Sequence, residues 1–267
     1  MHTLGSGRRT LIAVFLAVPF TLLQAADVLT WQQQEEFLTK AAIKQTKEAK
    51  KGVTGTLRVT LSDGTLTHDA SIQTIDESKQ FFLGEIGFKD SYKFNIVGWK
   101  LARLLGIEDM VPPSVRRNNQ GKAASYTWWV DDIVMDEEER RAKNIQAPDP
   151  ESWNHENNVM QVFDQLICNM DRNQTNMLID KNWHLWLIDH GRAFRTRKDL
   201  KDPSALKAVD RNMLAKIKAL DEATLAKEFG RDVTKDEIKG LLARRDLIVK
   251  VFEAKGESAL FDRPKRN

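Results

Sequence analysis

The sequence predicts an α+β protein with two lobes, a small β-rich lobe followed by a mainly helical one. Two observations support this prediction. Between about residue 53 and residue 132, polar and apolar residues alternate around short turns, with one strongly amphipathic helix among them. From residue 150 onward, apolar residues instead recur at helical spacing. A polar stretch lies where the two parts meet, and a cleft between lobes is a common place for a ligand.

Composition narrows the class of protein. Of the 267 residues, 41% are hydrophobic and 30% are charged, which is typical of globular chains and leaves ample length for a core. The 41 basic and 38 acidic side chains nearly cancel, giving a formal net charge of +3. A nucleic-acid-binding protein usually carries a concentrated basic face, so we expect no nucleic-acid partner.

Residues 1–26 have the pattern of a signal peptide. Two arginines precede the apolar run LIAVFLAVPFTLL, and small residues follow it for cleavage near Ala25 or Ala26. The run is shorter than the roughly 20 residues that a spanning helix needs, so an uncleaved membrane anchor is the less favoured alternative. Cys168 is the only cysteine, which excludes an internal disulfide. We expect an exported protein, periplasmic or secreted, with no stable membrane span after cleavage.

The β-rich lobe is expected over residues 53–132, after an N-terminal helix over residues 27–52. The segment TGTLRVTLSDGTLTHDASIQTID predicts a β-hairpin with a tight glycine turn. DSYKFNIVGWKLARLLGI predicts a long amphipathic helix, capped by Asp90 or Ser91 and ended by a glycine. MVPPSVRRNNQGKAASYTWWVDDIV predicts two further strands around an Asn-Asn-Gln-Gly turn.

The mainly helical lobe is expected over residues 133–267. PESWNHENNVMQVFDQLICN predicts one amphipathic helix, and the C-terminal third predicts at least three more. Thr234 followed by Glu237 matches a capping box, in which a hydroxyl and an acid three residues later both cap a helix start. Between these helices, MLIDKNWHLWLID predicts a short strand pair.

The stretch CNMDRNQTNMLIDKNWHLWLIDHGRAF, residues 168–194, carries the candidate chemistry. Asp171 and Arg172 stand in a polar loop together with Asn176, and Asp189 follows the second of two apolar segments. Each residue alone has an ordinary structural explanation, as a helix-end residue, a turn former or a strand-end cap. Taken together, they place carboxylate and amide oxygens, the ligands that Mg²⁺ prefers, at the junction of the two lobes.

This order of motifs resembles the catalytic core of the atypical kinases. An Asp-Arg-x-x-x-Asn loop, a short strand pair and then Ile-Asp-x-Gly are shared with the phosphatidylinositol 3- and 4-kinases, the bacterial HipA-type kinases and the secretory-pathway casein-kinase family. The resemblance covers roughly residues 55 to 195. It implies a two-lobed protein-kinase-like fold and transfer of the γ-phosphate of ATP to a hydroxyl, with Mg²⁺ or Mn²⁺ as cofactor.

The resemblance also implies roles for the residues of the motif. Asp171 would accept or orient the proton of the acceptor hydroxyl, and Arg172 would orient the loop through carboxylate contacts. Asn176 and Asp189 would hold the metal ion. The expected partners are therefore a nucleotide and an acceptor, which is a protein, a lipid or a small molecule that the sequence does not identify.

Two charged residues of such kinases are replaced in this sequence. By comparison, the strand lysine that grips the phosphates falls at Gln73, and its glutamate partner on the helix falls at Asn95. The two amides could hydrogen-bond to each other and preserve the geometry of the lobe. Lys79, Lys89 or Lys93 could supply the missing positive charge.

The segment YTWWVDD, residues 126–132, would connect the two lobes. Backbone groups of Trp129, Val130 and Asp131 would then contact adenine, with Trp128 or Trp129 as an apolar wall. Tryptophans packed in a core between strands explain the segment equally well.

Three functions remain open at this point. The first is an ATP-dependent kinase, which the motif pair and the order of the lobes favour. The second is a catalytically impaired pseudokinase that serves as an envelope interaction domain, suggested by the neutral pair at Gln73 and Asn95 and by the question of ATP supply outside the cytoplasm. The third is a structural or envelope-binding module of unrelated fold.

Overall fold

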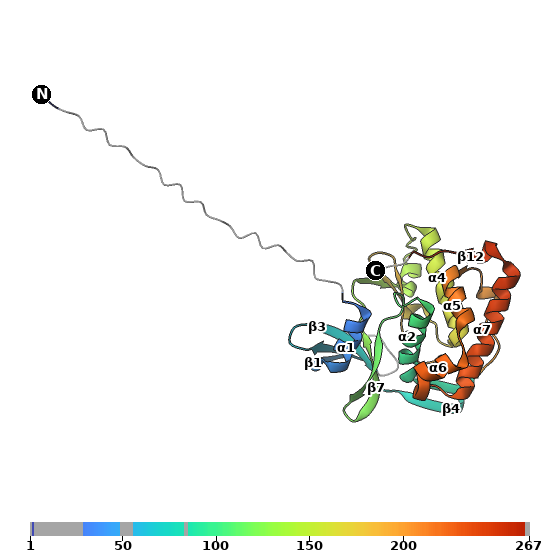
Figure 1. Cartoon of the computed structure of the whole chain (residues 1–267). Coiled ribbons are helices and arrows are strands. Elements are labelled where there is room, and N and C mark those ends of the chain that lie inside the picture. Colours follow the sequence, from blue (N-terminus) through green and yellow to red (C-terminus); the bar gives the residue numbers. More distant parts are fainter. Residues whose placement is uncertain (1, 3–28, 49–55, 83–84, 265–267) are drawn as a thin grey trace.

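The computed structural model describes residue 2 and residues 29–48, 56–82 and 85–264, and Figure 1 shows the whole chain. The signal peptide expected over residues 1–26 and its cleavage region fall, residue 2 aside, outside the described residues. Within the described ranges, no helix combines the length and the apolar character needed to cross a membrane.

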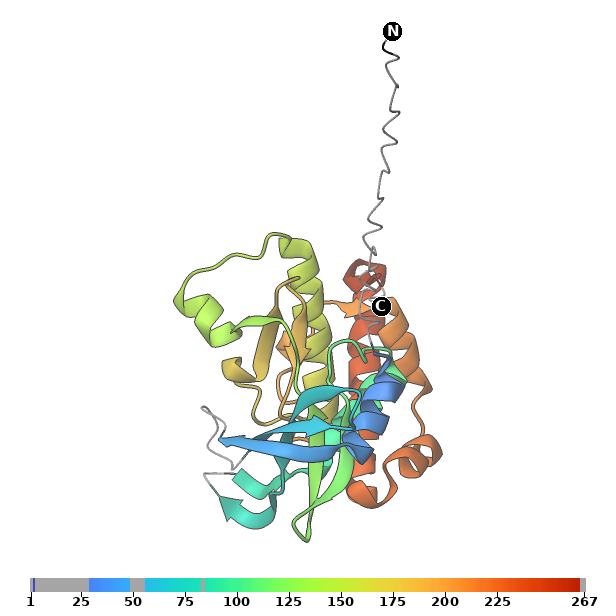
Figure 2. The ribbon, with the colours of Figure 1, turned by 90° about the vertical axis from the view of Figure 1, so that its left-hand side faces the viewer.

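The first lobe is built on a five-stranded antiparallel sheet in the order β1-β2-β3-β7-β6 (Figures 1 and 2). Helix α1 packs on this sheet, and its Phe37 and Leu38 share an apolar core with Leu61, Ile72 and Tyr126. The elements are α1 (Trp31–Lys40), β1 (Ala42–Glu48), β2 (Leu57–Ser62), β3 (Thr67–Gln73), β6 (Ser114–Asn119) and β7 (Lys122–Trp128).

The helix expected over residues 27–52 is shorter than predicted. α1 begins at a capping box formed by Thr30 and Gln33 and ends at Lys40. From Ala42 the chain instead forms β1, which pairs with β2 at the edge of the sheet. Backbone pairing with β2 decides this segment, and its own sequence does not reveal that pairing.

The predicted hairpin is confirmed by the antiparallel pairing of β2 and β3. The carboxylate of Asp63 closes the turn by accepting from the backbone N–H of Thr65 at 2.9 Å and of Leu66 at 2.8 Å. Gly64 stands there at φ +99°, a conformation that favours glycine. The second predicted strand pair is confirmed as β6 and β7.

The sequence does not predict the hairpin of β4 (Asp76–Phe82) and β5 (Glu85–Ser91). This ribbon forms its own two-stranded sheet between β3 and α2 in the chain. Most of β4 is exposed, so it lacks the alternation of buried and exposed residues that marks a strand in sequence. Phe82 and Phe88 pack across the ribbon with ring centroids 4.8 Å apart.

Helix α2 (Lys93–Leu105) confirms the predicted amphipathic helix, and Gly106 ends it in the left-handed conformation. The prediction of its start is only partly right. The N-cap residue is Tyr92, which makes no side-chain cap hydrogen bond, while Ser91 Oγ accepts from the N–H of Lys93 at 3.3 Å.

The second lobe contains the remaining helices, a three-stranded sheet in the order β10-β9-β8 and a short parallel pair, β11 with β12. The predicted capping box of Thr234 and Glu237 is present at the start of α7. The elements are β8 (Ile133–Asp136), α3 (Glu137–Ala142), α4 (Pro150–Ile167), η1 (Gln174–Asn176), β9 (Met177–Asp180), β10 (Leu185–Leu187), η2 (Pro203–Ala205), β11 (Val209–Asp210), α5 (Arg211–Ala219), α6 (Glu222–Phe229), η3 (Gly230–Asp232), α7 (Lys235–Lys255), η4 (Glu257–Ala259) and β12 (Leu260–Phe261).

The described residues form two separate apolar cores, and α2 belongs to the larger one. Phe94, Leu101 and Leu105 of α2 pack in one cluster with Phe163 of α4 and Ile217 of α5. The smaller cluster contains the sheet of the first lobe and α1. Although α2 follows the first strands in the chain, it is therefore packed with the helices of the second lobe.

Candidate active site

Local backbone geometry shapes the polar loop between α4 and β9. Cys168 ends α4 in the left-handed conformation, with φ +50°, and turns the chain out of the helix. The side chain of Asn173 accepts from the N–H of Asn176 at 3.1 Å and caps the turn η1. The N–H of Ile188 donates to the carbonyl oxygen of Asn176 at 3.2 Å. The end of the loop therefore lies against the strand end that leads into Asp189.

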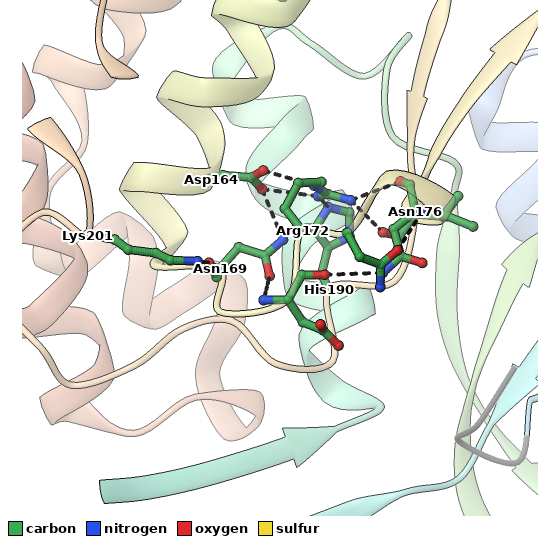
Figure 3. Close-up of polar contacts among 9 residues, drawn as sticks. Asp164, Asn169, Arg172, Asn176, His190 and Lys201 are labelled. Carbon is green, nitrogen blue, oxygen red and sulfur yellow. Dashed lines mark hydrogen bonds and ion pairs between the residues drawn. The ribbon is translucent and has the colours of Figure 1, made fainter. Parts of the chain in front are cut away.

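Arg172 ties the loop to its surroundings (Figure 3). Its guanidinium makes two hydrogen bonds to Asp164 of α4, from Nε at 2.9 Å and from Nη2 at 3.1 Å. Its Nη1 donates to the carbonyl oxygen of Asn176 at 3.0 Å and to that of Ile188 at 2.8 Å. Both partners of the ion pair are buried, with 8% of each side chain exposed. Arg172 therefore orients the loop as expected, and it also positions the strand end before Asp189.

Asp164, Asn169 and His190 complete this network, although the sequence analysis assigns no function to them. Asn169 donates to Asp164 through Nδ2 at 3.0 Å and accepts from the N–H of Asp171 through Oδ1 at 3.0 Å. Burial and the charge of Arg172 lower the pKa of His190 far below its ordinary value. The ring is therefore neutral, and its Nε2 accepts from Arg172 at 3.1 Å. Of these three residues, only Asp164 could have been noticed in the sequence, because its carboxylate lies directly beside the apolar stripe of a helix.

Asp189 occupies a strained backbone position in the interior of the site. Its φ of +55° lies in the left-handed region, which residues other than glycine rarely adopt and which often marks functional sites. Burial raises the pKa of its carboxyl. The N–H of Gly191, 3.4 Å from Oδ1, and the side chain of Gln73 oppose this rise, while the charge of Asp171 adds to it.

Gln73 and Asn95 come together at the junction of the two cores. Asn95 Nδ2 donates to Gln73 Oε1, and Asn95 Oδ1 accepts from the N–H of His190 at 2.8 Å. The side chain of Gln73 also donates to Thr56 Oγ1 at 3.1 Å. Neutral amides therefore link β3, α2 and the segment after β10, at the place where the resemblance implies a lysine and a glutamate.

Asp90, at the end of β5, is a further acidic neighbour that the sequence analysis considers only as a helix cap. Its Oδ1 lies 2.6 Å from the point where a Cβ at Gly191 would stand, and Asp189 Oδ1 lies 3.4 Å from the same point. A Cβ at this position would therefore require the side chain of Asp90 to move. Burial and then the charge of Asp189 raise the pKa of Asp90 to about 6, against the opposing charges of Arg192 and Arg195.

Asp171, like Asp189, is partly exposed to solvent. Its side chain is 38% exposed, and Arg192 Nη1 lies 3.2 Å from its Oδ2. Asn176 Nδ2 donates to the backbone oxygen of Asp171 at 3.2 Å. The structure therefore gathers Asp171, Arg172, Asn176 and Asp189 in one region, where Asp171 and Asp189 are both partly exposed.

The three lysines considered as replacements for the strand lysine each have another anionic partner. None of them has an ion pair or hydrogen bond to Gln73 or Asn95 in the described part of the chain. Their ion pairs are Lys79–Glu77 at 3.0 Å, Lys89–Glu237 at 2.6 Å and Lys93–Asp76 at 2.6 Å. Lys79 also lies over the ring of Phe82, 4.1 Å from its centroid. The structure does not bring Lys79 into contact with the amide pair.

The two tryptophans before the connection between the lobes have structural partners. Trp128 packs in the core of the first lobe and stacks on His68 with centroids 3.6 Å apart. The guanidinium of Arg58 lies 4.1 Å from the centroid of the Trp129 ring. The N–H of Trp129 donates to the carbonyl oxygen of Asp69 at 3.2 Å. Packing between strands therefore accounts for Trp128, and the N–H of Trp129 is already engaged in the sheet.

The remaining residues of the connection are held from both lobes. Val130 is buried, and Asp131 Oδ2 lies 2.8 Å from His68 Nε2 of β3. The carbonyl oxygen of Asp132 accepts from the N–H of Lys181, in the turn after β9, at 3.0 Å. Trp129, Val130 and Asp131 thus lie in a segment that joins the two lobes, and adenine contact by their backbone stays a prediction.

The donor set of the site fits a divalent cation that also binds phosphate. Burial raises the pKa of both Asp90 and Asp189, because it disfavours their charged forms. A cation beside them would stabilise these charged forms. Asn176 uses its amide nitrogen on Asp171, which leaves its carbonyl oxygen as a ligand atom. Among the residues described, no three His, Cys, Asp or Glu side chains could hold a metal ion by themselves. Asn176 and Asp189 are the residues that would hold such an ion, which would neutralise negative charge near them.

Known proteins resemble this chain in structure but not in sequence. No protein-family model and no curated protein sequence matches it. A hydra Fam20 structure with a sugar superposes with a TM-score of 0.66 at 16% identity, covering 87% of this chain and 92% of the other. A Golgi casein kinase gives 0.57 at 15% identity, over 88% of this chain and 79% of the other.

A bacterial kinase extends the likeness. The Helicobacter pylori proinflammatory kinase CtkA superposes with a TM-score of 0.52 at 10% identity, covering 80% of this chain and 93% of the other. The three structures agree with the antiparallel first lobe and the helical second lobe described above. The predicted α+β architecture is therefore confirmed: the chain has the two-lobed fold of the atypical kinases.

Proposed function

We propose that this chain is an exported phosphotransferase that moves the γ-phosphate of ATP to a hydroxyl acceptor with the help of Mg²⁺ or Mn²⁺. One observation carries the proposal. In a kinase-like fold, the buried side chain of Arg172 holds the carbonyl groups of Asn176 and Ile188 and brings two partly exposed carboxylates, Asp171 and Asp189, into one region. Phosphoryl transfer depends mainly on such positioning of groups and on neutralisation of charge.

Each residue of the site has a task in this proposal. Asp171 accepts or orients the proton of the acceptor hydroxyl, because 38% of its side chain is open to solvent. Asn176 and Asp189 hold the metal ion, which when bound neutralises charge on the phosphates. Hydrogen bonds of Gln73 and Asn95 join β3 and α2 to the backbone next to Asp189. Neither side chain carries a positive charge that could pair with the phosphates.

Export and the acceptor are proposed from observations outside the catalytic residues. Export rests on the signal-like sequence of residues 1–26, and a Golgi kinase among the similar structures is consistent with it. The acceptor is a protein, a lipid or a small molecule with a free hydroxyl. Trp129, Val130 and Asp131 are proposed to line the adenine end of the cleft because they join the two lobes.

Nucleotide binding tests the proposal most directly. We expect Mg-ATP or Mn-ATP to raise the melting temperature of the mature chain, since a ligand at 100 times its Kd stabilises the folded state by about 2.7 kcal/mol. Asp189→Asn should abolish the shift. Asparagine is the better replacement than alanine here because it tolerates the left-handed backbone of this position.

Turnover provides the second test. Asp171→Asn should keep the nucleotide shift but lower ATP turnover by roughly 10²–10⁴-fold, the usual contribution of a general base. Glu253→Gln, an exposed substitution on α7, serves as the control and should change neither measurement. Equal turnover in the wild type and in Asp171→Asn would rule out the proposed role of Asp171.

A pseudokinase is the second candidate, and one observation favours it. The amide pair of Gln73 and Asn95 is neutral, and Lys79, Lys89 and Lys93 are all engaged in other ion pairs. Such a protein would bind nucleotide weakly and act as an interaction domain. Asp189-dependent hydrolysis of ATP or autophosphorylation would exclude this candidate.

A further inference from the structure

A cavity of about 620 Å³ lies between α1, α2, β6 and the turn from α6 to η3. Helix α2 contributes Ile96 and Lys100 to its lining. The face of α2 that serves the candidate active site is a different one, since Asn95 and Gly98 contact His190 there. The volume is in the range of small-molecule sites. The cavity is therefore a separate candidate site that shares only the helix α2 with the active site.

The acidic side chains in the lining are mostly engaged already. Three of its four carboxylates have a donor within hydrogen-bond or ion-pair distance, and the fourth, Glu228, is exposed. The engaged carboxylates are Glu36 with Lys40 at 2.6 Å, Glu35 with Trp99 Nε1 at 2.6 Å and Arg103 at 3.4 Å, and Asp232 with Arg116.

Three cations in the lining have no such partner. Lys100, Lys227 and Arg231 form no ion pair with a carboxylate in the part of the chain that the structure describes. Lys100 Nζ donates to the carbonyl oxygen of Glu228 at 2.8 Å. Burial lowers the pKa of Lys100; Glu228 opposes this, and the charges of Arg116 and Arg231 add to it. Lys100, Lys227 and Arg231 therefore line one cavity without a carboxylate at ion-pair distance, while the charges of Glu228 and Glu35 act on Lys100 from farther away.

We propose that this cavity binds a phosphate-bearing small molecule. Lys100, Lys227 and Arg231 would contact the phosphate, since a dianion with several acceptor oxygens matches three donors better than a single carboxylate does. Ile96 and Phe229 supply apolar surface for the organic part of the ligand.

The position of the cavity predicts what the ligand does to the protein. α1 and β6 pack with the smaller apolar core, whereas α2 and Phe229 of α6 belong to the larger one. Two contacts already cross the cavity, from Lys100 to Glu228 and from Arg116 to Asp232. A phosphate bound by Lys100, Lys227 and Arg231 would add a third connection, which joins α2 to α6 and η3. It should therefore stabilise the folded chain and raise its melting temperature.

Calorimetric titration of the mature chain tests the proposal. The probes are inorganic phosphate, pyrophosphate and glucose 6-phosphate, at constant ionic strength with chloride as the reference anion. We expect saturable binding with a Kd below about 1 mM, tighter for the two larger probes. The double variant Lys227→Gln/Arg231→Gln, which changes two exposed side chains, should weaken binding at least tenfold.

Two controls separate this site from the others. Lys218→Gln removes an exposed lysine that pairs with Glu253 outside the cavity, and it should leave binding unchanged. Asp189→Asn should also leave it unchanged, so this test does not depend on the proposed function. The absence of saturable binding would overturn the proposal. So would binding that Asp189→Asn abolishes while the double variant keeps it.

Discussion

At the scale of single residues, Arg172 shows how one side chain assembles a site from three parts of the chain. Its guanidinium contacts Asp164 of α4, the carbonyl oxygen of Asn176 and the carbonyl oxygen of Ile188. A planar fork with five donors can serve all of these acceptors at once, whereas an ammonium group is a single point of charge. Arginine is therefore required at this position by geometry as well as by charge.

The substitution Arg172→Lys should accordingly destabilise the fold although it keeps the charge. We expect a loss of about 2 kcal/mol or more in the free energy of unfolding, because carbonyl groups and part of the Asp164 carboxylate lose their buried donors. Urea denaturation measures this loss. Arg211→Lys is the matched control, since 47% of the Arg211 side chain is exposed and its partners Glu257 and Asp262 are 79% and 81% exposed. Equal losses in the two variants would contradict the role given to Arg172.

At the scale of elements, helix α7 is fitted closely to the segment that follows Asp189. A Cβ at Gly240 would stand 2.9 Å from the carbonyl oxygens of both Arg195 and Thr196. Gly240→Ala would help an isolated helix by about 1 kcal/mol. Here we expect it to destabilise the protein by about 1–3 kcal/mol, because backbone atoms must move. Thermal unfolding checks the sign, and Lys239→Ala at the neighbouring exposed position is the control.

The sheet of the first lobe contains an acid that makes its stability depend on pH. Burial opposes the ionisation of Asp69, but hydrogen bonds from Thr60, Arg58 and Lys47 outweigh it and lower the pKa below 3.8. A carboxyl with a lowered pKa stabilises the fold above its ordinary pKa, and this contribution disappears as the pH falls through the folded value.

The melting temperature of the wild type should therefore fall more steeply below pH 3.8 than that of Asp69→Asn. The comparison requires melting curves from neutral pH down to about pH 2.5. Asp236→Asn is the control, because 77% of the Asp236 side chain is exposed. Parallel curves for the wild type and Asp69→Asn would show that the hydrogen bonds of Asp69 do not couple its charge to folding.

At the scale of the whole molecule, the division into two cores sets which parts unfold together. α2 shares the larger apolar cluster with α4 and α5, and it also packs on β6 and β7 of the first lobe. Val59→Ala in the smaller core should increase amide hydrogen exchange in β1, β2 and β3 and leave α2 as protected as α4. Hydrogen exchange followed by mass spectrometry gives this comparison. Loss of protection in α2 together with the sheet would show that the two cores act as one.

The extent to which sequence predicts this fold depends on where each element finds its partners. The hairpin at Gly64, helix α2 and the capping box of Thr234 follow from local patterns, and the structure confirms them. β1 depends on pairing with β2, and β4 pairs with β5 while nearly all of its residues are exposed, so neither strand carries an alternating pattern of buried and exposed residues. For the same reason the assignment of α2 to a core could not be made from its place in the chain.

Some residues of the candidate site could be predicted from the sequence, and others could not. Asp171, Arg172, Asn176 and Asp189 share one short stretch of sequence, so their order could be recognised as a motif. Asp90 could not be recognised, because its approach to Asp189 depends on how β5 meets Gly191. Asp164 could be noticed in the sequence only as a carboxylate beside the apolar stripe of a helix. Its partner Arg172 comes after the end of that helix, so helical spacing does not reveal their contact. The Gln73–Asn95 contact could be anticipated only through the resemblance.

The buried Arg244 of α7 has a consequence for how such a protein could be controlled. Its guanidinium donates to the carbonyl oxygens of Leu166, Arg195 and Arg197, and burial lowers its pKa to about 10, still well above neutrality. The segment after Asp189 is therefore held in place by hydrogen bonds from a buried, positively charged side chain. Its order does not require the charge that a chemical modification would add. The order of this stretch therefore depends on a side chain of the protein itself, and on–off control of the proposed activity would have to act elsewhere.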